Sequence, residues 1–281
     1  MTSERKVGLG PGQTVAAEGE LRAEKIEALR KYVMRVRFKN ETMSESMLTT
    51  ETFLPVPRRT WEVKVDGKLD EWRGRAAQVR PEQMTEEYFN PLRGKGLEDL
   101  AAATWLAWDE SGLYMAIEAK DDRVVLSEAP TVWDFDSLQI ACDPLRDDPP
   151  RAGFEREDFE LEIARMRDGK VFLDAGRFPE GKIESVVEQT VKVAVEPLER
   201  GGGLSYEIFI PAELFHPARW ELHSLLGFNF ILNDNDGEGR EGWWELAPGI
   251  GYGKEPFQYP AMWLVEEQQK INSQDRQDGQ D

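Results

Sequence analysis

Hydrophobic and polar residues alternate with a period of two along most of the chain from Trp61 onward. Two alternating segments, residues 103–108 and 113–119, flank Asp-Glu-Ser-Gly at residues 109–112, which predicts a hairpin. Similar segments occupy residues 159–163, 191–195, 206–210 and 228–232, and residues 211–215 fit a single helical turn. Because short strands follow one another without long helices between them, the pattern predicts an all-β protein, an antiparallel β-sandwich or jelly-roll-like module.

The first 57 residues follow a different pattern from the predicted sandwich, which spans residues 58–266. Residues 21–31 fit a short helix, whereas residues 32–38 and 47–54 read as strands, and residues 55–57 (Pro-Val-Pro) read as a stiff linker. Residues 1–57 contain too few alternating segments to bury a core of their own. We expect an N-terminal extension, such as the trailing strands of a neighbouring domain, that lies against the sandwich edge or is loose.

The last segment, residues 267–281, is rich in Gln and Asp and has almost no apolar residues. A segment of this composition cannot bury enough apolar surface to offset the entropy of ordering. We therefore expect a disordered tail after the sandwich.

The charge balance narrows the range of partners. The chain has 35 Lys and Arg against 54 Asp and Glu, a formal net charge of -19, which repels nucleic acid and anionic membranes. No segment approaches the ~20 apolar residues of a membrane helix, and the N-terminus lacks the apolar core of a secretory signal. We expect no nucleic-acid or membrane partner. The protein is then either cytoplasmic or part of a longer secreted chain, which would place it outside the cell or in the periplasm.

The supply of metal-binding and catalytic side chains is also limited. Cys142 is the one cysteine, so no disulfide forms within the chain and no thiolate metal site exists. His216 and His223 are the only histidines, which argues against zinc, haem and histidine acid–base chemistry.

Trp133 stands where a predicted loop becomes a predicted strand, next to two carboxylates. From Ser137 onward, Leu138, Ile140 and Cys142 face one side, and Gln139 faces the other. Sugars bind to such surfaces, because an aromatic ring stacks on the apolar face of the sugar while amides and carboxylates receive its hydroxyls. The alternative is that Trp133 closes the edge of the core.

Three blocks of sequence resemble the family 9 carbohydrate-binding modules, which are often attached to xylanases and other glycoside hydrolases. The blocks are Val-Asp-Gly-Lys-Leu-Asp-Glu-Trp at 65–72, residues 107–122 followed by Trp-Asp-Phe-Asp-Ser-Leu-Gln at 133–139, and residues 227–237 followed by Trp-Glu-Leu-Ala-Pro-Gly-Ile-Gly-Tyr at 244–252. Their order and spacing extend the resemblance over roughly residues 58–266. The resemblance implies a calcium-bearing β-sandwich that clamps a terminal sugar between two aromatic rings.

The resemblance also assigns candidate sugar-binding residues, some of which depart from the family pattern. Trp133 falls on the first clamp residue, and Tyr252 falls where the family has a second tryptophan. Gln139 replaces a glutamate, and Glu162 falls near an arginine of the family, so the charge there is reversed. Asn233 and Asn235 remain amides in the loop beside the clamp. Because of these departures, the resemblance does not imply which sugar is bound. The alternative is a domain of the same fold that has lost sugar binding and serves a structural or protein-interaction role.

The resemblance implies a non-catalytic module that binds poly- or oligosaccharide and targets a larger, covalently linked glycoside hydrolase to its polysaccharide. Catalysis is the rival hypothesis, since Glu160 and Glu162 share one strand face at about 7 Å, within the range of glycosidase pairs. We expect both glutamates to be solvated, with no reason for a raised pKa, and therefore no intrinsic glycosidase activity.

Calcium has two candidate sites among the acidic residues. Asp66 and Asp70 bracket a tight glycine turn, and Asp121, Asp122 and Asp136 lie at neighbouring strand ends, where oxygen ligands suit calcium. Residues 234–245 carry acidic side chains spaced as in an EF-hand loop. Because residues 228–232 before this segment read as a strand, we interpret it as a Gly-rich loop between strands.

Overall fold

The computed structural model describes residues 28–39, 44–75, 79–80, 96–128, 131–148, 151, 153–177, 189–198 and 202–266. The predicted tail at residues 267–281 and nearly all of the predicted helix at residues 21–31 lie outside these ranges. None of the helices in the described ranges has the length and apolar composition to cross a membrane.

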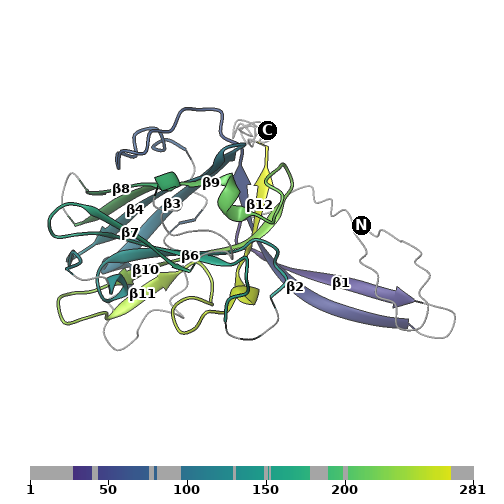
Figure 1. The fold of residues 1–281 in the computed structure, drawn as a ribbon. Helices are drawn as coiled ribbons and strands as arrows, with labels where there is room; N and C mark the ends of the chain where they lie inside the picture. Colours follow the sequence, from purple (N-terminus) through teal and green to yellow (C-terminus); the bar gives the residue numbers. More distant parts are fainter. Residues whose placement is uncertain are drawn as a thin grey trace, which may run out of the picture.

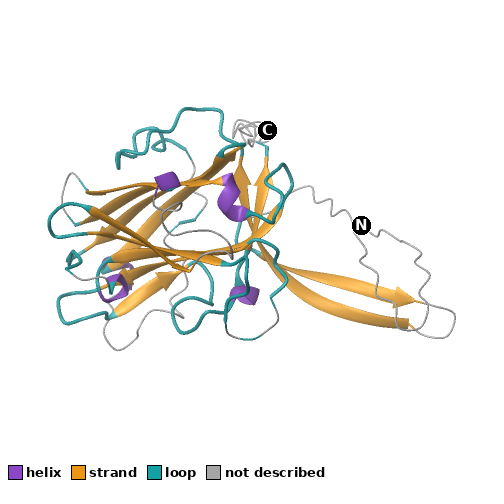
Figure 2. Ribbon diagram, in the orientation of Figure 1, coloured by secondary structure: helices purple, strands orange, loops and turns teal. Residues whose placement is uncertain are grey.

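Two β-sheets form the body of the protein, as the alternating pattern predicts (Figures 1 and 2). The larger sheet has the order β1-β2-β12-β10-β5-β6-β7, and β11 also pairs with β10. Its strands are β1 (Lys31–Lys39), β2 (Ser44–Pro57), β5 (Ser137–Asp143), β6 (Phe159–Arg165), β7 (Val171–Arg177), β10 (Leu225–Asp234), β11 (Gly242–Glu245) and β12 (Ala261–Val265). All pairs in this sheet are antiparallel except β2 with β12.

The smaller sheet has the order β3-β4-β9-β8 and is antiparallel throughout. Its strands are β3 (Leu100–Asp109), β4 (Gly112–Asp121), β8 (Lys192–Pro197) and β9 (Gly203–Pro211). Four short 3-10 turns complete the described elements: η3 (Gly96–Glu98), η4 (Val132–Asp134), η5 (Ala212–Phe215) and η6 (Pro256–Gln258). The predicted hairpin at residues 109–112 is confirmed by β3 and β4, and the predicted helical turn is confirmed by η5.

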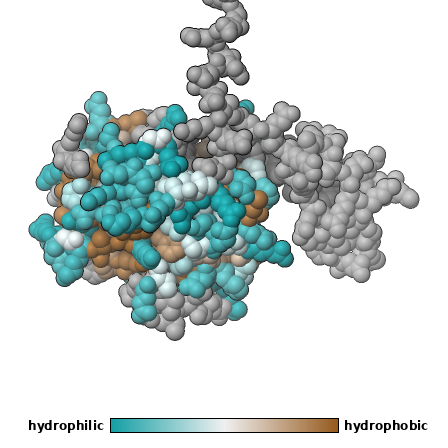
Figure 3. Space-filling view, turned by 90° about the horizontal axis from the view of Figure 1, so that it is seen from above, coloured by the Kyte–Doolittle hydropathy of each residue, from teal (hydrophilic) through white to brown (hydrophobic). Residues whose placement is uncertain are grey.

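The main hydrophobic core lies between the two sheets. From β5 it receives Leu138, Ile140 and Cys142, which confirms the direction of alternation read from the sequence. The opposite face of β5 carries Ser137, Gln139 and Ala141. The outer face of the body is mostly hydrophilic in the view from above, as the large net charge leads one to expect (Figure 3).

The second N-terminal strand, β2, joins the sandwich at its C-terminal end. β1 and β2 make a hairpin that projects from the body (Figure 1), and residues 53–57 of β2 pair in parallel with β12. Leu54 and Val56 have no exposed surface and belong to the core between the sheets. The expectation that this segment lies against the sandwich edge is confirmed for β2. The interpretation of residues 55–57 as a linker is wrong, because prolines are tolerated in a strand near a sheet edge.

Candidate functional site

Two exposed aromatic rings mark one end of the larger sheet. Trp133 lies in η4, directly before β5, and 40% of its surface is exposed. Tyr252 follows β11 and is 79% exposed, with its ring packed edge-on against Trp243 at a centroid distance of 4.7 Å. Stacking on a ligand would remove the apolar area of these rings from water.

Trp133 precedes β5 and Tyr252 follows β11, and these two strands pair with β10. Ser137 of β5 pairs with Asn233 of β10, which in turn pairs with Trp243 of β11. Since strands lie about 4.8 Å apart, β5 and β11 are separated by about 10 Å. The two rings therefore come from segments next to strands on either side of β10, near the end of the sheet where Asn233 pairs with Ser137 and Trp243.

A hydrogen-bonded network of amides and carboxylates lies on the sheet face between these strands. The Gln139 amide donates to the carboxylates of Glu160 at 3.0 Å and Glu162 at 3.4 Å. The Asn233 amide donates to the Ser137 hydroxyl at 2.9 Å and to the Gln139 carbonyl at 3.3 Å. The Asn233 carbonyl oxygen is buried and has no hydrogen-bond partner, so it remains available as an acceptor.

This polar face is buried, which corrects the expectation that its glutamates are solvated. Glu160 and Glu162 are only 3% and 8% exposed. The loop after β11 covers part of the face, because Ile250 and Tyr259 pack on Ala141 with Ile231 and Trp243. Burial raises the pKa of Glu162 to about 7, with a further contribution from the neighbouring carboxylate of Glu160. Alternation alone identifies the polar face but not the loop that covers it.

Arg240 lies over the ring of Trp243 and is not identified from the sequence. Its guanidinium carbon stands 4.2 Å from the centre of the Trp243 ring. Burial lowers the pKa of Arg240, while the charges of Glu245 and Asp134 oppose this effect. Two of its nitrogens, Nε and Nη2, are buried without a hydrogen-bond partner, so the side chain presents unused donors next to the rings.

Two further charged residues order the loop that carries Tyr252. Glu245, 1% exposed, accepts hydrogen bonds from the backbone N–H groups of Ile250 and Gly251, the latter at 2.9 Å. Lys254 binds the Glu160 carboxylate with its ammonium group. In the sequence, the only indication of a role for Glu245 and Lys254 is that they lie a few residues before and after Tyr252.

Asn235 has its side-chain polar atoms engaged by the backbone of its own loop and of the turn that carries Trp133. Its side-chain amide donates to the Asp134 carbonyl, and its side-chain carbonyl accepts from the backbone N–H of Gly237 at 2.5 Å. Asn235 therefore ties the β10–β11 loop to the turn that carries Trp133. On that turn, Thr131 and Asp134 line a depression with a volume of about 470 Å³.

A cluster of buried carboxylates lies near the same end of the sheet. Asp121 at the end of β4, Asp136 before β5 and Asp234 at the end of β10 are 7%, 4% and 1% exposed. One oxygen from each of the three lies within 4.8 Å of the others. Burial and mutual repulsion raise the pKa of Asp136 to about 9 and that of Asp234 to about 8. The Oδ2 atom of Asp234 is buried without a hydrogen-bond partner.

The two candidate calcium sites from the sequence have different arrangements in the structure. Asp121 and Asp136 come together, and Asp234 joins them from the end of β10. Of the segment interpreted as a loop between strands, residues 235–241 connect β10 to β11, whereas residues 242–245 form β11. Asp66 and Asp70 lie elsewhere, paired with Lys64 at 2.8 Å and Arg73 at 3.1 Å. Their turn is held by the buried carboxylate of Glu207, which accepts hydrogen bonds from the backbone of Asp66 and Gly67 at 3.0 and 2.8 Å.

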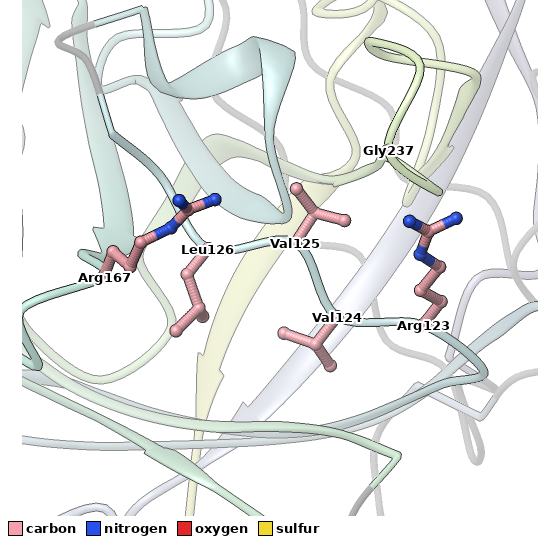
Figure 4. Close-up of a pocket in the computed structure, with 6 residues that line it drawn as sticks. All are labelled: Arg123, Val124, Val125, Leu126, Arg167 and Gly237. Atoms are coloured by element: carbon pink, nitrogen blue, oxygen red, sulfur yellow. The ribbon is translucent and has the colours of Figure 1, made fainter.

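A second shallow depression, of about 450 Å³, is shown in Figure 4. It lies beside Asp121 and Asp136, which accept hydrogen bonds from the backbone of Arg123 and Val125. The segment from Arg123 to Leu126 forms its floor, and Arg167 and Gly237 complete it. It contains no aromatic ring and no carboxylate, so we assign no ligand to it.

Comparisons with known proteins agree on the fold. The sequence model of the carbohydrate family 9 binding domain-like family matches residues 65–266. A family 9 carbohydrate-binding module from Caldicellulosiruptor kristjanssonii in complex with cellotriose is similar, with a TM-score of 0.54 and 16% identity over 78% of this chain and 97% of that chain. A family 9 module from the same organism in complex with glucose gives 0.54 and 17% over 79% and 100%.

At these identities, the likeness to solved structures shows the fold alone, and a search of curated proteins finds no match. The family match carries more weight, because it extends over most of the chain and includes both sheets from β3 to β12. The chain therefore belongs to the carbohydrate family 9 binding domain-like family.

Proposed function

We propose that this protein binds a saccharide by stacking one sugar ring between Trp133 and Tyr252. The observation that carries the proposal is the pair of exposed rings at one end of the sheet, in the segments next to β5 and β11. The Asn233 carbonyl and the unpaired N–H groups of Arg240 supply hydrogen-bonding partners beside them. Glu162 and Gln139 form the floor below, and Asn235 positions the turn of Trp133.

The bound sugars of the similar modules, glucose and cellotriose, support a glucose-containing ligand as the first probe. The polar floor differs from the pattern expected of the family, since an amide stands at Gln139 and a carboxyl at Glu162. We therefore propose as the ligand class a neutral oligosaccharide whose end carries free hydroxyls.

We further propose that the protein does not hydrolyse its ligand. A glycosidase needs two carboxyl groups about 5–10 Å apart with the sugar between them. Here the Gln139 amide bridges Glu160 and Glu162 and fills that space, and Lys254 neutralises Glu160. Binding without chemistry suits a module that targets a linked polysaccharide-degrading domain, outside the cell or in the periplasm, a role supported by the resemblance to modules attached to glycoside hydrolases.

Calcium is the proposed structural cofactor, held by Asp121, Asp136 and Asp234. Three buried carboxylates cannot all be ionised without a compensating cation, and calcium prefers such oxygen ligands. The Asp234 oxygen without a partner fits a metal ligand. When bound, the ion would neutralise these charges and hold together the ends of β4, β5 and β10.

One observation favours the alternative, a structural or protein-interaction domain without sugar binding. The loop after β11 covers part of the polar face, and Gln139 already bonds to Glu160 and Glu162. In that case the exposed rings would contact a protein partner instead of a sugar.

Binding to a glycan panel, measured with and without EDTA, separates these functions. We expect saturable binding to one class of oligosaccharide, including glucose-containing chains, and weaker binding in EDTA. An absence of binding to every glycan in calcium-loaded protein would favour the alternative.

A further inference from the structure

The hairpin of β1 and β2 extends beyond the body of the protein as an arm, formed by residues 31–39 and 44–52. Among the described strands, these two segments pair only with each other. Figure 1 shows the arm standing clear of the two sheets. A two-stranded hairpin is at best marginally stable in water and needs a third strand or an apolar surface to pack on. The arm therefore requires a partner surface.

The two faces of the arm differ in character. Strand alternation assigns positions 34, 36 and 38 to the face of Tyr32, and these positions carry Met, Val and Phe. Met47 pairs with Val36 on the same face. The opposite face belongs to positions 31, 33, 35, 37 and 39, which carry Lys, Val, Arg, Arg and Lys. One face of the arm is thus apolar and the other basic.

The apolar face continues onto the body of the protein. The ring of Tyr32 packs edge-on against Phe53 at 5.8 Å, and Phe53 packs against Trp263 at 6.4 Å. Leu225 pairs with Trp263 and is 40% exposed. The residues that follow Phe53 and Leu225 and flank Trp263 belong to the core between the sheets, so these three side chains lie on the outer face. We call this row, from Leu225 through Tyr32 to position 38, the apolar strip.

The charge of the arm indicates what kind of partner covers the strip. Residues 29–39 contain five Lys and Arg and no acidic residue, so the rest of this chain of net charge -19 carries -24. The arm attracts an acidic surface, whereas the body repels nucleic acid and anionic membranes. Edge-to-edge pairing of two β1 strands would bring like charges at Arg35 and Arg37 together, which is unfavourable. The contact therefore uses the apolar strip, and the partner is acidic.

We propose that the partner is a second copy of this chain. Around a two-fold axis, the two arms stack face to face in opposite directions through their apolar strips. An arm of nine residue pairs is about 30 Å long, so its tip reaches the body of the other copy. The same patch serves on both copies, as in other two-fold interfaces, and each basic arm meets an acidic body. This contact does not involve Trp133 or Tyr252, so it is independent of the proposed sugar site.

Sedimentation equilibrium of the full chain, from low micromolar to several hundred micromolar, tests the proposal. The parent should show a monomer–dimer equilibrium. Val36→Ser should weaken dimerisation at least about 10-fold, because the two-fold axis removes the apolar side chain from both copies. Val33→Ser is the matched control, since it makes the same exchange in the same strand at a position that is 68% exposed on the opposite face. It should change the dimer Kd by less than about 2-fold.

A second pair of variants tests the part of the strip that lies on the body. Leu225→Ser should weaken dimerisation, whereas Leu97→Ser, at a 43% exposed leucine in η3, should not. A parent that stays monomeric at every concentration would overturn the proposal, and another part of the chain or a different protein would then cover the strip. A dimer that Val36→Ser and Leu225→Ser leave intact, or that Val33→Ser weakens equally, would overturn it as well. Binding of cellotriose to the monomer would leave the sugar proposal standing in each case.

Discussion

The buried carboxyl of Glu162 should make the stability of this protein depend on pH. Its pKa of about 7 in the folded protein compares with an ordinary value of 4.5, and burial is the main cause. The folded state therefore holds this proton more tightly than the unfolded state does. Stability from this group is greatest below pH 4.5, falls as the pH rises toward 7, and is fully lost above it.

The size of the effect follows from the same two pKa values. The full difference corresponds to about 3 kcal/mol of unfolding free energy, of which about 2.5 kcal/mol is lost between pH 5 and pH 8. Glu162→Gln removes the titration and keeps the shape and polarity of the side chain. The variant should exceed the parent in stability by about 0.8 kcal/mol at pH 5 and by about 3.3 kcal/mol at pH 8.

Urea denaturation followed by tryptophan fluorescence measures this difference. Other titrating groups are common to both proteins, so they cancel when the two are compared at each pH. Glu213→Gln, at an exposed position on η5, is the matched control and should show no such divergence. An equal stability difference between parent and Glu162→Gln at pH 5 and pH 8 would refute the argument.

Three other outcomes follow from the structure. Millimolar calcium should raise the melting temperature relative to chelator, because calcium at 100 times its Kd adds about 2.7 kcal/mol to the free energy of unfolding. Asp136→Asn should remove most of that gain. Identical melting curves with calcium and with chelator would contradict the calcium site of Asp121, Asp136 and Asp234. Leu54→Ala should lower stability by about 2–5 kcal/mol because it opens a cavity in the core, whereas exposed Val33→Ala should change it by less than about 0.5 kcal/mol; a neutral Leu54→Ala would mean that β2 does not belong to the sandwich. The purified chain should release no product from aryl glycosides or from xylan, glucan and mannan oligomers, and turnover lost in Glu160→Gln would show that it is an enzyme.

The period-two pattern was sufficient to predict the sandwich. It identified the hairpin of β3 and β4 and the inward face of β5, because alternation reports directly on which side chains meet the core. It did not place residues 55–57, since two prolines resemble a linker. Their strand depends on β12, a partner about 200 residues later, and local sequence carries no information about that pairing.

The candidate site was partly predictable for a similar reason. Trp133 and Tyr252 follow from spacing within a family pattern, and both are exposed. Arg240 and Lys254 approach the site through loops, whose course depends on tertiary contacts such as the bond from Lys254 to Glu160. The same loops bury Glu162, so its raised pKa was not evident from alternation.

Calorimetric titration of the calcium-loaded protein with cellotriose tests the sugar clamp most directly. The parent should bind, and Trp133→Ala should weaken binding by about 1–3 kcal/mol, a factor of about 5 to 160 in Kd. Its melting temperature should stay near that of the parent, because Trp133 is 40% exposed. Leu225→Ala, equally exposed at the far end of β10, should bind as the parent does. A Trp133→Ala variant that binds cellotriose like the parent, or that loses its fold, would contradict the clamp.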